Sequence, residues 1–366
     1  MMNNFYTVNI EMYKYEYQQY ENSDQYADYI LAQAKRNKNS IQTDADNFLL
    51  ITTLLWEPHL LNNFELYKNL FESFARKKIK TILIINSYYK EMELSNLETE
   101  VHYIDYFLWR TYDKVVRQKK CSFNAQWNSN AIKFLILNGK PGRLNRIRLL
   151  WKLKELLSKA IWSLHVHSGT WQESHDMLPE LTDQQFTDFV KQYNNNPDQV
   201  KIIFQENSLH YGGIPFDAEL YANSLFRIIT ETDFHTQKNI QPWLTEKTFI
   251  TMLNNMPFIL AGDRGSVNKL KHMGFKTFEN FLPIPNYDNI ENSEEKLDAI
   301  VTNTHFWINE MKNKEEIQQD ITSNYNRLLL LAKKNKETLE KICIKYRIDP
   351  ARIEDLCSTY DILGHE

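Results

Sequence analysis

The acid–base pair Glu246-Lys247 stands between Thr245 and Thr248, directly before a helix-length apolar stretch. Backbone N–H groups at a helix entrance, together with a neighbouring ammonium group, can hold a phosphate, and a carboxylate can bind the diol of a ribose. Either threonine could cap the helix or donate a hydrogen bond to a phosphate oxygen. Taken alone, the four residues favour an ordinary helix start with Glu in its first turn.

Other residues of suitable chemistry follow predicted strands. The apolar run 132–138 is followed by a Gly-Lys-Pro-Gly turn and then by Arg143 and Arg146. A guanidinium group can bind phosphate through two N–H groups and can neutralise charge on a leaving group. Glu231 follows another apolar run, and ligands bind beyond the carboxyl ends of strands in open α/β sheets. The alternatives are a loop carboxylate for Glu231 and a solvated basic helix face, which we favour for Arg148.

The elements that would position these residues are short apolar runs ending in polar or turn residues. Such runs predict buried strands, and the helical spacing of 61–78 between two of them gives the strand–helix–strand unit of a parallel sheet. The predicted strands are 47–54, 80–86, 132–138, 160–166, 224–230 and 257–260, and the run 101–109 is predicted to be a further strand that enters a helix. We also predict helices at about 143–159 and 182–193. The fold class is therefore α/β.

The chain of 366 residues is long enough for two domains of Rossmann size. A polar stretch before residue 132 separates two series of strands, and amphipathic helices follow residue 290. We predict an N-terminal Rossmann-like acceptor-side domain at 1–125 and a donor-binding domain at 126–300. A C-terminal helical segment, 301–366, is expected to pack across both domains.

The runs TEKT, PF, GFKTF and YD occur in this order between residues 245 and 288. This order resembles the donor-binding half of GT-B type glycosyltransferases, closest to the fucosyltransferase and exostosin-like families and to related bacterial and viral glycosyltransferase-like proteins. The resemblance covers about 130–295. It implies two Rossmann-like domains, and a nucleotide-diphosphate sugar as the donor substrate with no further cofactor. The acceptor would be a hydroxyl of a glycan or glycoconjugate, and transfer would be inverting and independent of metal.

The resemblance also implies roles for individual residues. Glu246 would bind the ribose, and Lys247 and Arg146 the phosphates. Asn145 stands before Arg146 where histidine is commoner in these families, so any role of that imidazole is missing here.

The general base is less well defined by the sequence. An inverting transfer needs a carboxylate or histidine to accept the acceptor proton, and in GT-B enzymes this group usually comes from the first domain. Asp105 and Glu57 are the candidates, with His59 near the second. The triplet 44–46 formally matches the metal-binding Asp-X-Asp of the other large glycosyltransferase class, but it precedes the first clear strand. We therefore predict no metal.

Composition narrows the alternatives. A net charge of −4 argues against binding a polyanion, although the basic stretch 140–159 leaves a nucleic-acid base glycosyltransferase open. A protein of the same fold that binds nucleotides or carbohydrates without catalysis is the other alternative. Three scattered cysteines predict reduced thiols, and no export signal or membrane span is readable, so we expect a cytoplasmic protein with at most peripheral membrane contact. The sequence does not define an oligomeric state.

Overall fold

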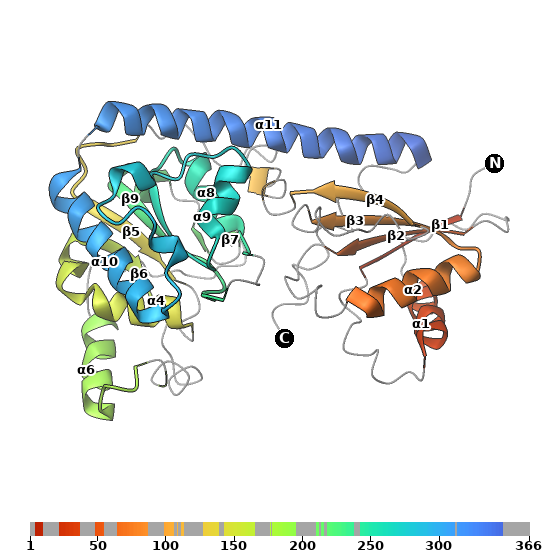
Figure 1. Cartoon of the computed structure of the whole chain (residues 1–366), viewed down its shortest axis with the longest axis horizontal. Helices are drawn as coiled ribbons and strands as arrows, with labels where there is room; N and C mark the ends of the chain where they lie inside the picture. The colour runs from red at the N-terminus through yellow and green to blue at the C-terminus, as the bar shows by residue number, and fades with distance from the viewer. Residues whose placement is uncertain are drawn as a thin grey trace. The chain divides into compact units, whose positions relative to one another are not determined.

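A computed structural model gives the fold, and the chain divides into two compact units (Figure 1). The first unit combines 1–109 with 332–366, and the second is 110–331. The chain passes from one unit to the other after residues 109 and 331. The domain boundaries at 125 and 300 stay a prediction. The structure describes residues 4–9, 22–36, 48–54, 64–86, 99–105, 108, 111–112, 127–138, 143–164, 176, 178–194, 210–211, 214–215, 218–237, 242–311 and 313–346.

The first unit contains a parallel sheet whose strands follow the order of the sequence, β1-β2-β3-β4. The strands are β1 (Asn4–Asn9), β2 (Phe48–Leu54), β3 (Lys80–Asn86) and β4 (Thr99–Ile104). Residues 82–84 of β3 are buried on both faces of the sheet, which is why this strand reads as a continuous apolar run. Because the strand order never reverses, this sheet has no topological switch point among the described strands.

Two helices, α1 (Ser23–Arg36) and α2 (Phe64–Arg76), lie on one side of this sheet (Figure 1). They contact each other, and their buried aromatic and aliphatic residues, among them Tyr26, Ile30, Leu70, Phe71 and Phe74, form the core of the unit. Right-handed crossovers between strands in sequential order place successive helices on the same face.

The end of the long helix α11 (Lys314–Tyr346) also belongs to the first unit. The side chain of Asn335 exchanges two hydrogen bonds of 3.3 Å with the backbone of Asp105. Glu100 of β4 accepts hydrogen bonds from Lys345, at 2.7 Å, and from the hydroxyl of Tyr346. Burial alone would raise the pKa of Glu100, but these two bonds and one from His102 outweigh it and lower the pKa from 4.5 to about 2.

We expect Glu100→Gln to loosen the end of α11 in a pH-dependent way. A depressed carboxyl pKa stabilises the folded state above about pH 4.5, and that contribution is lost as the pH falls towards 2. Thermal unfolding should show the variant less stable than wild type at pH 7, by about 1 kcal/mol or less, with the gap closing in acid. Glu337→Gln, on an exposed face of α11, is the control. A gap that stays constant with pH would contradict the expectation.

The second unit contains a parallel sheet of order β10-β9-β5-β6. Its strands are β5 (Lys133–Leu137), β6 (Ala160–Ser163), β9 (Ser224–Thr230) and β10 (Phe258–Ala261). From β5 the chain builds the sheet in one direction to β6, and it then returns to the other side of β5 to add β9 and β10. The order therefore reverses between β5 and β9, and open α/β sheets bind ligands beyond the carboxyl ends of strands at such a point.

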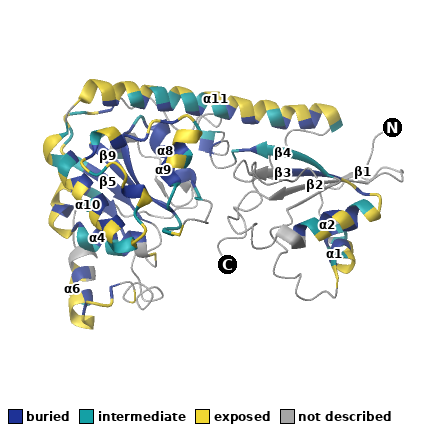
Figure 2. Cartoon of the chain, in the orientation of Figure 1, coloured by how far each residue is buried: buried dark blue, intermediate teal, exposed yellow. Residues whose placement is uncertain are grey.

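Helices cover both faces of this sheet, whose strands are buried in Figure 2. On one face, Leu135 and Leu137 pack against Ile250 of α8 (Glu246–Leu253) and Tyr221 of α7 (Ala218–Ala222). Successive residues of a strand point to opposite faces. On the other face, Phe134 stacks on Phe226 with ring centroids 5.6 Å apart, and Phe226 meets Trp307 of α10 (Ser293–Glu310) edge-on.

Ion pairs fasten α4 (Leu144–Lys152) to α10. Arg148 binds Glu294, and it binds Glu180 at 3.0 Å. Lys152 binds Glu294 at 3.1 Å and Asp298 at 2.5 Å. Arg148 is thus engaged in structural contacts, where the sequence favoured a solvated face.

The second unit contains several further short helices and strands. They are η6 (Lys154–Lys159), α6 (Asp183–Asn194), β7 (His210–Tyr211), β8 (Ile214–Pro215), α9 (Ser266–His272), η8 (Glu279–Phe281) and η9 (Tyr287–Asn289). Within the described part of the chain, no helix is both long and apolar enough to cross a membrane. The predicted α/β class with parallel sheets is confirmed.

Candidate functional site

Polar side chains gather at the carboxyl ends of β5 and β9, where the strand order reverses. Thr230, the last residue of β9, donates a hydrogen bond of 2.6 Å to the side chain of Asn138, directly after β5. Asn145, in the first turn of α4, donates to the backbone oxygens of Glu231 and Ala261, at 2.9 and 3.4 Å. The start of α4 is therefore tied to the ends of β9 and β10.

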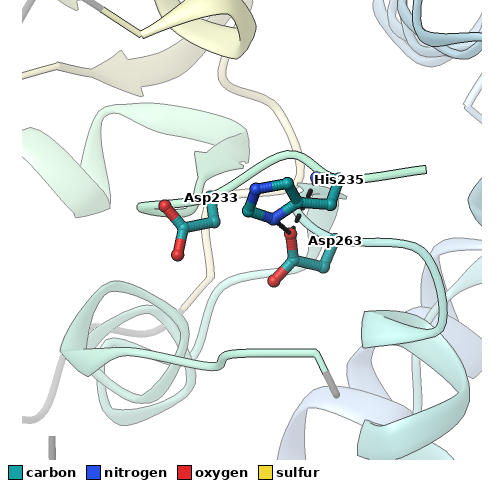
Figure 3. Close-up of side chains that lie close together, drawn as sticks. All are labelled: Asp233, His235 and Asp263. Atoms are coloured by element: carbon teal, nitrogen blue, oxygen red, sulfur yellow. Dashed lines mark hydrogen bonds and ion pairs between the residues drawn. The ribbon is translucent and has the colours of Figure 1, made fainter. Parts of the chain in front are cut away.

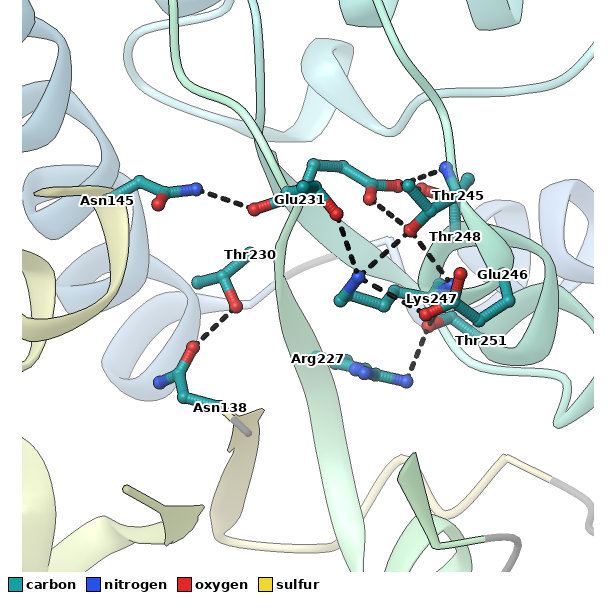
Figure 4. A network of polar contacts seen from close by, with 11 residues as sticks. Asn138, Asn145, Arg227, Thr230, Glu231, Thr245, Glu246, Lys247, Thr248 and Thr251 are labelled. Atoms are coloured by element: carbon teal, nitrogen blue, oxygen red, sulfur yellow. Dashed lines mark hydrogen bonds and ion pairs between the residues drawn. The ribbon is translucent and has the colours of Figure 1, made fainter. Parts of the chain in front are cut away.

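Glu231 is the centre of a buried network at this edge (Figure 4). Its side chain is inaccessible to solvent, and one carboxylate oxygen accepts the N–H of Thr245 at 3.0 Å and the hydroxyl of Thr248 at 2.5 Å. The other oxygen accepts the hydroxyl of Thr245. Burial raises the pKa of Glu231, and the charge of Lys247 opposes that rise. The carboxyl group thus holds the start of α8 against the end of β9.

The close approach of Glu231 depends on a small residue after β10. A Cβ atom on Gly262 would lie 3.3 Å from both Cβ and Cγ of Glu231 and 3.0 Å from the hydroxyl oxygen of Ser266. These contacts are tighter than ordinary van der Waals distances, so a larger residue would require Glu231 or Ser266 at the start of α9 to shift.

The start of α8 is the predicted helix entrance, and the prediction of its cap is confirmed. Thr245 is the N-cap, and its hydroxyl accepts the N–H of Lys247. The ammonium group of Lys247 donates to the Thr245 hydroxyl at 3.1 Å, to Glu246 at 3.2 Å and to the Thr232 hydroxyl at 3.4 Å. The side chains of Glu246 and Lys247 are only 10 and 11% exposed. The pair is therefore held in one arrangement at the mouth of the helix.

Two arginines of the α4 entrance add positive charge to the same edge. Arg146 is 5% exposed, and burial, helped by the charge of Arg143, lowers its pKa to about 10. The charges of Glu231, Glu246 and Asp233 oppose that lowering, so Arg146 lies within electrostatic range of the α8 entrance. Arg143 is half-exposed and pairs with Asp233 at 3.0 Å. The seven residues predicted to bind the donor are therefore brought together in one unit.

A second cluster, which the sequence did not single out, lies beside this edge (Figure 3). Asp233 and His235 follow β9, and Asp263 follows β10. One ligand atom from each lies within 4.8 Å of the other two. Nδ1 of His235 lies 2.9 Å from Oδ1 of the buried Asp263. Two carboxylates and an imidazole are the donor set of a divalent cation, or of a proton-transfer dyad. The signal in the sequence was their position, directly after two neighbouring strands.

Tyr287 and Asp288, the YD run of the predicted donor motif, make structural contacts that support the site. The hydroxyl of Tyr287 accepts the backbone N–H of Leu260 in β10, at 2.9 Å. Asp288 accepts the N–H of Val267 at 2.9 Å and pairs with Lys296 at 3.1 Å, and both charged side chains are almost fully buried. Lys296 also donates to the backbone oxygen of Gly262 at 2.9 Å. These contacts fix the loop between β10 and α9.

The predicted general bases belong to the first unit or lie outside the described residues. Asp105 follows β4 directly and is half-buried, with its backbone bound to Asn335. Glu57 lies outside the described residues, as do His59 and the triplet 44–46. The role of Asp105 and Glu57 as proton acceptors stays a prediction.

Comparisons with known proteins leave the geometry as the main guide to function. No protein-family model matches the sequence, and neither a curated protein nor a solved structure is significantly similar to the chain.

Proposed function

We propose that the protein is a glycosyltransferase built from two Rossmann-like domains. It would transfer a sugar from a nucleotide-diphosphate donor to a hydroxyl of a glycan or glycoconjugate, in the cytoplasm. The observation that carries the proposal is the convergence of Lys247, Arg146 and Arg143 with the capped start of α8 at the reversal of strand order. A diphosphate needs cations and N–H donors, and this edge of the sheet has both.

Within this proposal the residues divide into ligands and supports. Lys247 and Arg146 would hold the diphosphate, assisted by Arg143, and Glu246 would bind the ribose hydroxyls. Thr245 and Thr248 donate hydrogen bonds to the carboxylate of Glu231. These three residues would therefore hold the helix entrance in place. Glu231, which the sequence suggested as a ligand, is therefore assigned a positioning role.

A panel of nucleotides tests the proposal. We expect one nucleoside diphosphate, and its sugar conjugate, to raise the thermal unfolding midpoint, because a ligand at 100 times its dissociation constant stabilises by about 2.7 kcal/mol. Release of nucleoside diphosphate from the conjugate should accompany binding. Binding without release would favour the non-catalytic alternative, and no stabilisation by any member of the panel would overturn the donor site.

The proposed reaction is independent of metal and inverts the sugar carbon. We expect full activity in EDTA, because cationic side chains can stabilise the departing diphosphate. NMR of the product should show the opposite anomeric configuration to the donor. Loss of activity in EDTA would contradict this, and would point to Asp233, His235 and Asp263 as metal ligands.

The nucleic-acid alternative has less support in the second unit. Arg148 and Lys152, in the middle of the basic stretch 140–159, are neutralised by Glu294 and by their other acidic partners. A phosphate backbone would have to compete with these ion pairs. We therefore favour a glycan or glycoconjugate acceptor.

A further inference from the structure

The imidazole of His235 is held by a single buried carboxylate. Oδ1 of Asp263 accepts the backbone N–H of His235 at 2.8 Å and lies 2.9 Å from its Nδ1, and Oδ2 accepts the N–H of Trp243 at 3.2 Å. The backbone oxygen of His235 accepts the N–H of Arg264 at 2.6 Å. Asp263 is 2% exposed at its side chain, whereas His235 is 42% exposed. A rigid, buried acid thus orients a solvent-facing base.

This arrangement defines the tautomer of the ring. A carboxylate offers only acceptor atoms, so Nδ1 of a neutral His235 must carry the hydrogen. The lone pair then lies on Nε2, which is on the side of the ring away from Asp263 in Figure 3. A neutral imidazole in this tautomer can accept a proton on Nε2, and the carboxylate stabilises the imidazolium that forms.

Charges around the ring are arranged on several elements. Asp233 lies on the same loop as His235, and Asp263 and Arg264 follow β10. Arg143, from the entrance of α4, neutralises Asp233, and Lys296, from α10, is an electrostatic neighbour of Asp263. Arg143 in turn neighbours Arg146. The cluster that contains His235 therefore adjoins the cationic edge at which the donor diphosphate is proposed to bind.

Proton transfer suits this cluster better than a resident cation. The 2.9 Å contact between Nδ1 and Oδ1 is a direct hydrogen bond with no room for an ion between the two atoms. The guanidinium group of Arg143 already neutralises Asp233 at 3.0 Å. A divalent ion would have to displace one or both of these contacts.

We propose that His235, oriented by Asp263, is the general base of the transfer, in place of Asp105 or Glu57. This role rests on the proposed glycosyltransferase function. The acceptor oxygen forms a bond to the anomeric carbon, and the bond from that carbon to the diphosphate oxygen breaks with its electron pair leaving on the diphosphate. The acceptor proton passes to Nε2 of His235. With water as the acceptor, the same step releases free sugar and nucleoside diphosphate.

The first test measures the ring itself and requires no activity. Nitrogen-15 NMR of histidine-labelled protein should show His235 as the Nδ1–H tautomer at high pH, with the signal identified by its loss in His235→Gln. In Asp263→Asn the preference for this tautomer should weaken. An Nε2–H tautomer in wild type would overturn the proposal, because Nε2 could not then accept a proton.

The second test measures release of nucleoside diphosphate from the nucleotide sugar that binds best, with water as acceptor. Removing a general base costs about 10²- to 10⁴-fold in rate. His235→Gln should lose that much, with donor affinity within about twofold of wild type, and the pH dependence of the rate due to the imidazole should disappear. The matched control is His272→Gln, on the exposed last turn of α9, which should behave as wild type.

The possible outcomes distinguish the role of His235 as general base from the proposed glycosyltransferase function. Turnover that is equal in His235→Gln and His272→Gln would overturn the role of His235 alone, and a large loss in Asp105→Asn would then return the base to the first unit. Absence of turnover in wild type with every nucleotide sugar would overturn the glycosyltransferase proposal and this role together.

Discussion

Replacing Lys247 or Arg146 by methionine should weaken the binding of nucleoside diphosphate by about one to two decades. The loss follows from one charge-assisted hydrogen bond to phosphate, which contributes about 1.5 to 3 kcal/mol. Methionine keeps most of the length and apolar surface of either side chain, so the change mainly removes charge. Titration calorimetry with the best diphosphate of the panel gives the affinity directly.

The matched control is Arg148→Met, on the same helix as Arg146 and two residues further along. Arg148 is bound to Glu180 and Glu294, so its loss should lower the thermal unfolding midpoint and leave nucleotide affinity unchanged. Lys247→Met and Arg146→Met should instead weaken nucleotide binding. Unchanged affinity in both Lys247→Met and Arg146→Met would remove the diphosphate site from this edge of the sheet.

Several strands could be read from the sequence because their environment imposes a continuous apolar run. The predictions 80–86 and 224–230 coincide with β3 and β9, the second of which is buried along its whole length. A strand covered on both faces needs apolar residues at every position. Because helices cover both faces of the second sheet, β9 is a continuous apolar run that can be recognised in the sequence.

Other elements carry weaker patterns and were missed or misplaced. β1 mixes asparagine, tyrosine and threonine with apolar residues, and no strand was predicted there. The run 101–109 is predicted to be a strand that enters a helix. β4 begins two residues before this run, at Thr99, and ends at Ile104, and the described residues 108, 111 and 112 are helical. The predicted helix at 143–159 changes to a 3-10 helix after Leu153. The spacing of apolar residues does not predict the residue at which tertiary packing ends a helix or strand.

The candidate site was predictable from the sequence only in part. The helix entrance at Thr245 could be recognised because capping is a local interaction. The contacts of Glu231 with Thr245 and Thr248, and the ion pair of Arg143 with Asp233, join residues that are distant in the sequence. These contacts form only when the chain folds, so local spacing does not predict them. His235 and Asp263 come from the ends of two neighbouring strands, a proximity that follows from the sheet order and not from spacing.

The largest effect on stability is expected from Glu231→Ala, which should destabilise the second unit by about 3 kcal/mol or more. The variant leaves three buried donors without their acceptor, namely the N–H and hydroxyl of Thr245 and the hydroxyl of Thr248. A buried polar group that loses its partner costs about 1 to 3 kcal/mol, and the cavity left by the side chain adds to that cost. Part of the loss will be recovered, because burial raises the pKa of Glu231 and thus opposes its charged form.

A graded series checks this account of the network by thermal unfolding, in which 1 kcal/mol shifts the midpoint by about 2 to 4 °C for a unit of this size. Thr248→Val removes one donor and should cost about 1 kcal/mol, and Thr245→Val should cost more because it also removes the helix cap. Glu155→Ala, on an exposed turn of η6, should cost almost nothing. Because the start of α8 carries Lys247, Glu231→Ala should weaken nucleotide binding together with stability. A Glu231→Ala variant as stable as Glu155→Ala would show that the carboxylate does not hold the helix entrance, and the positioning role would have to be abandoned.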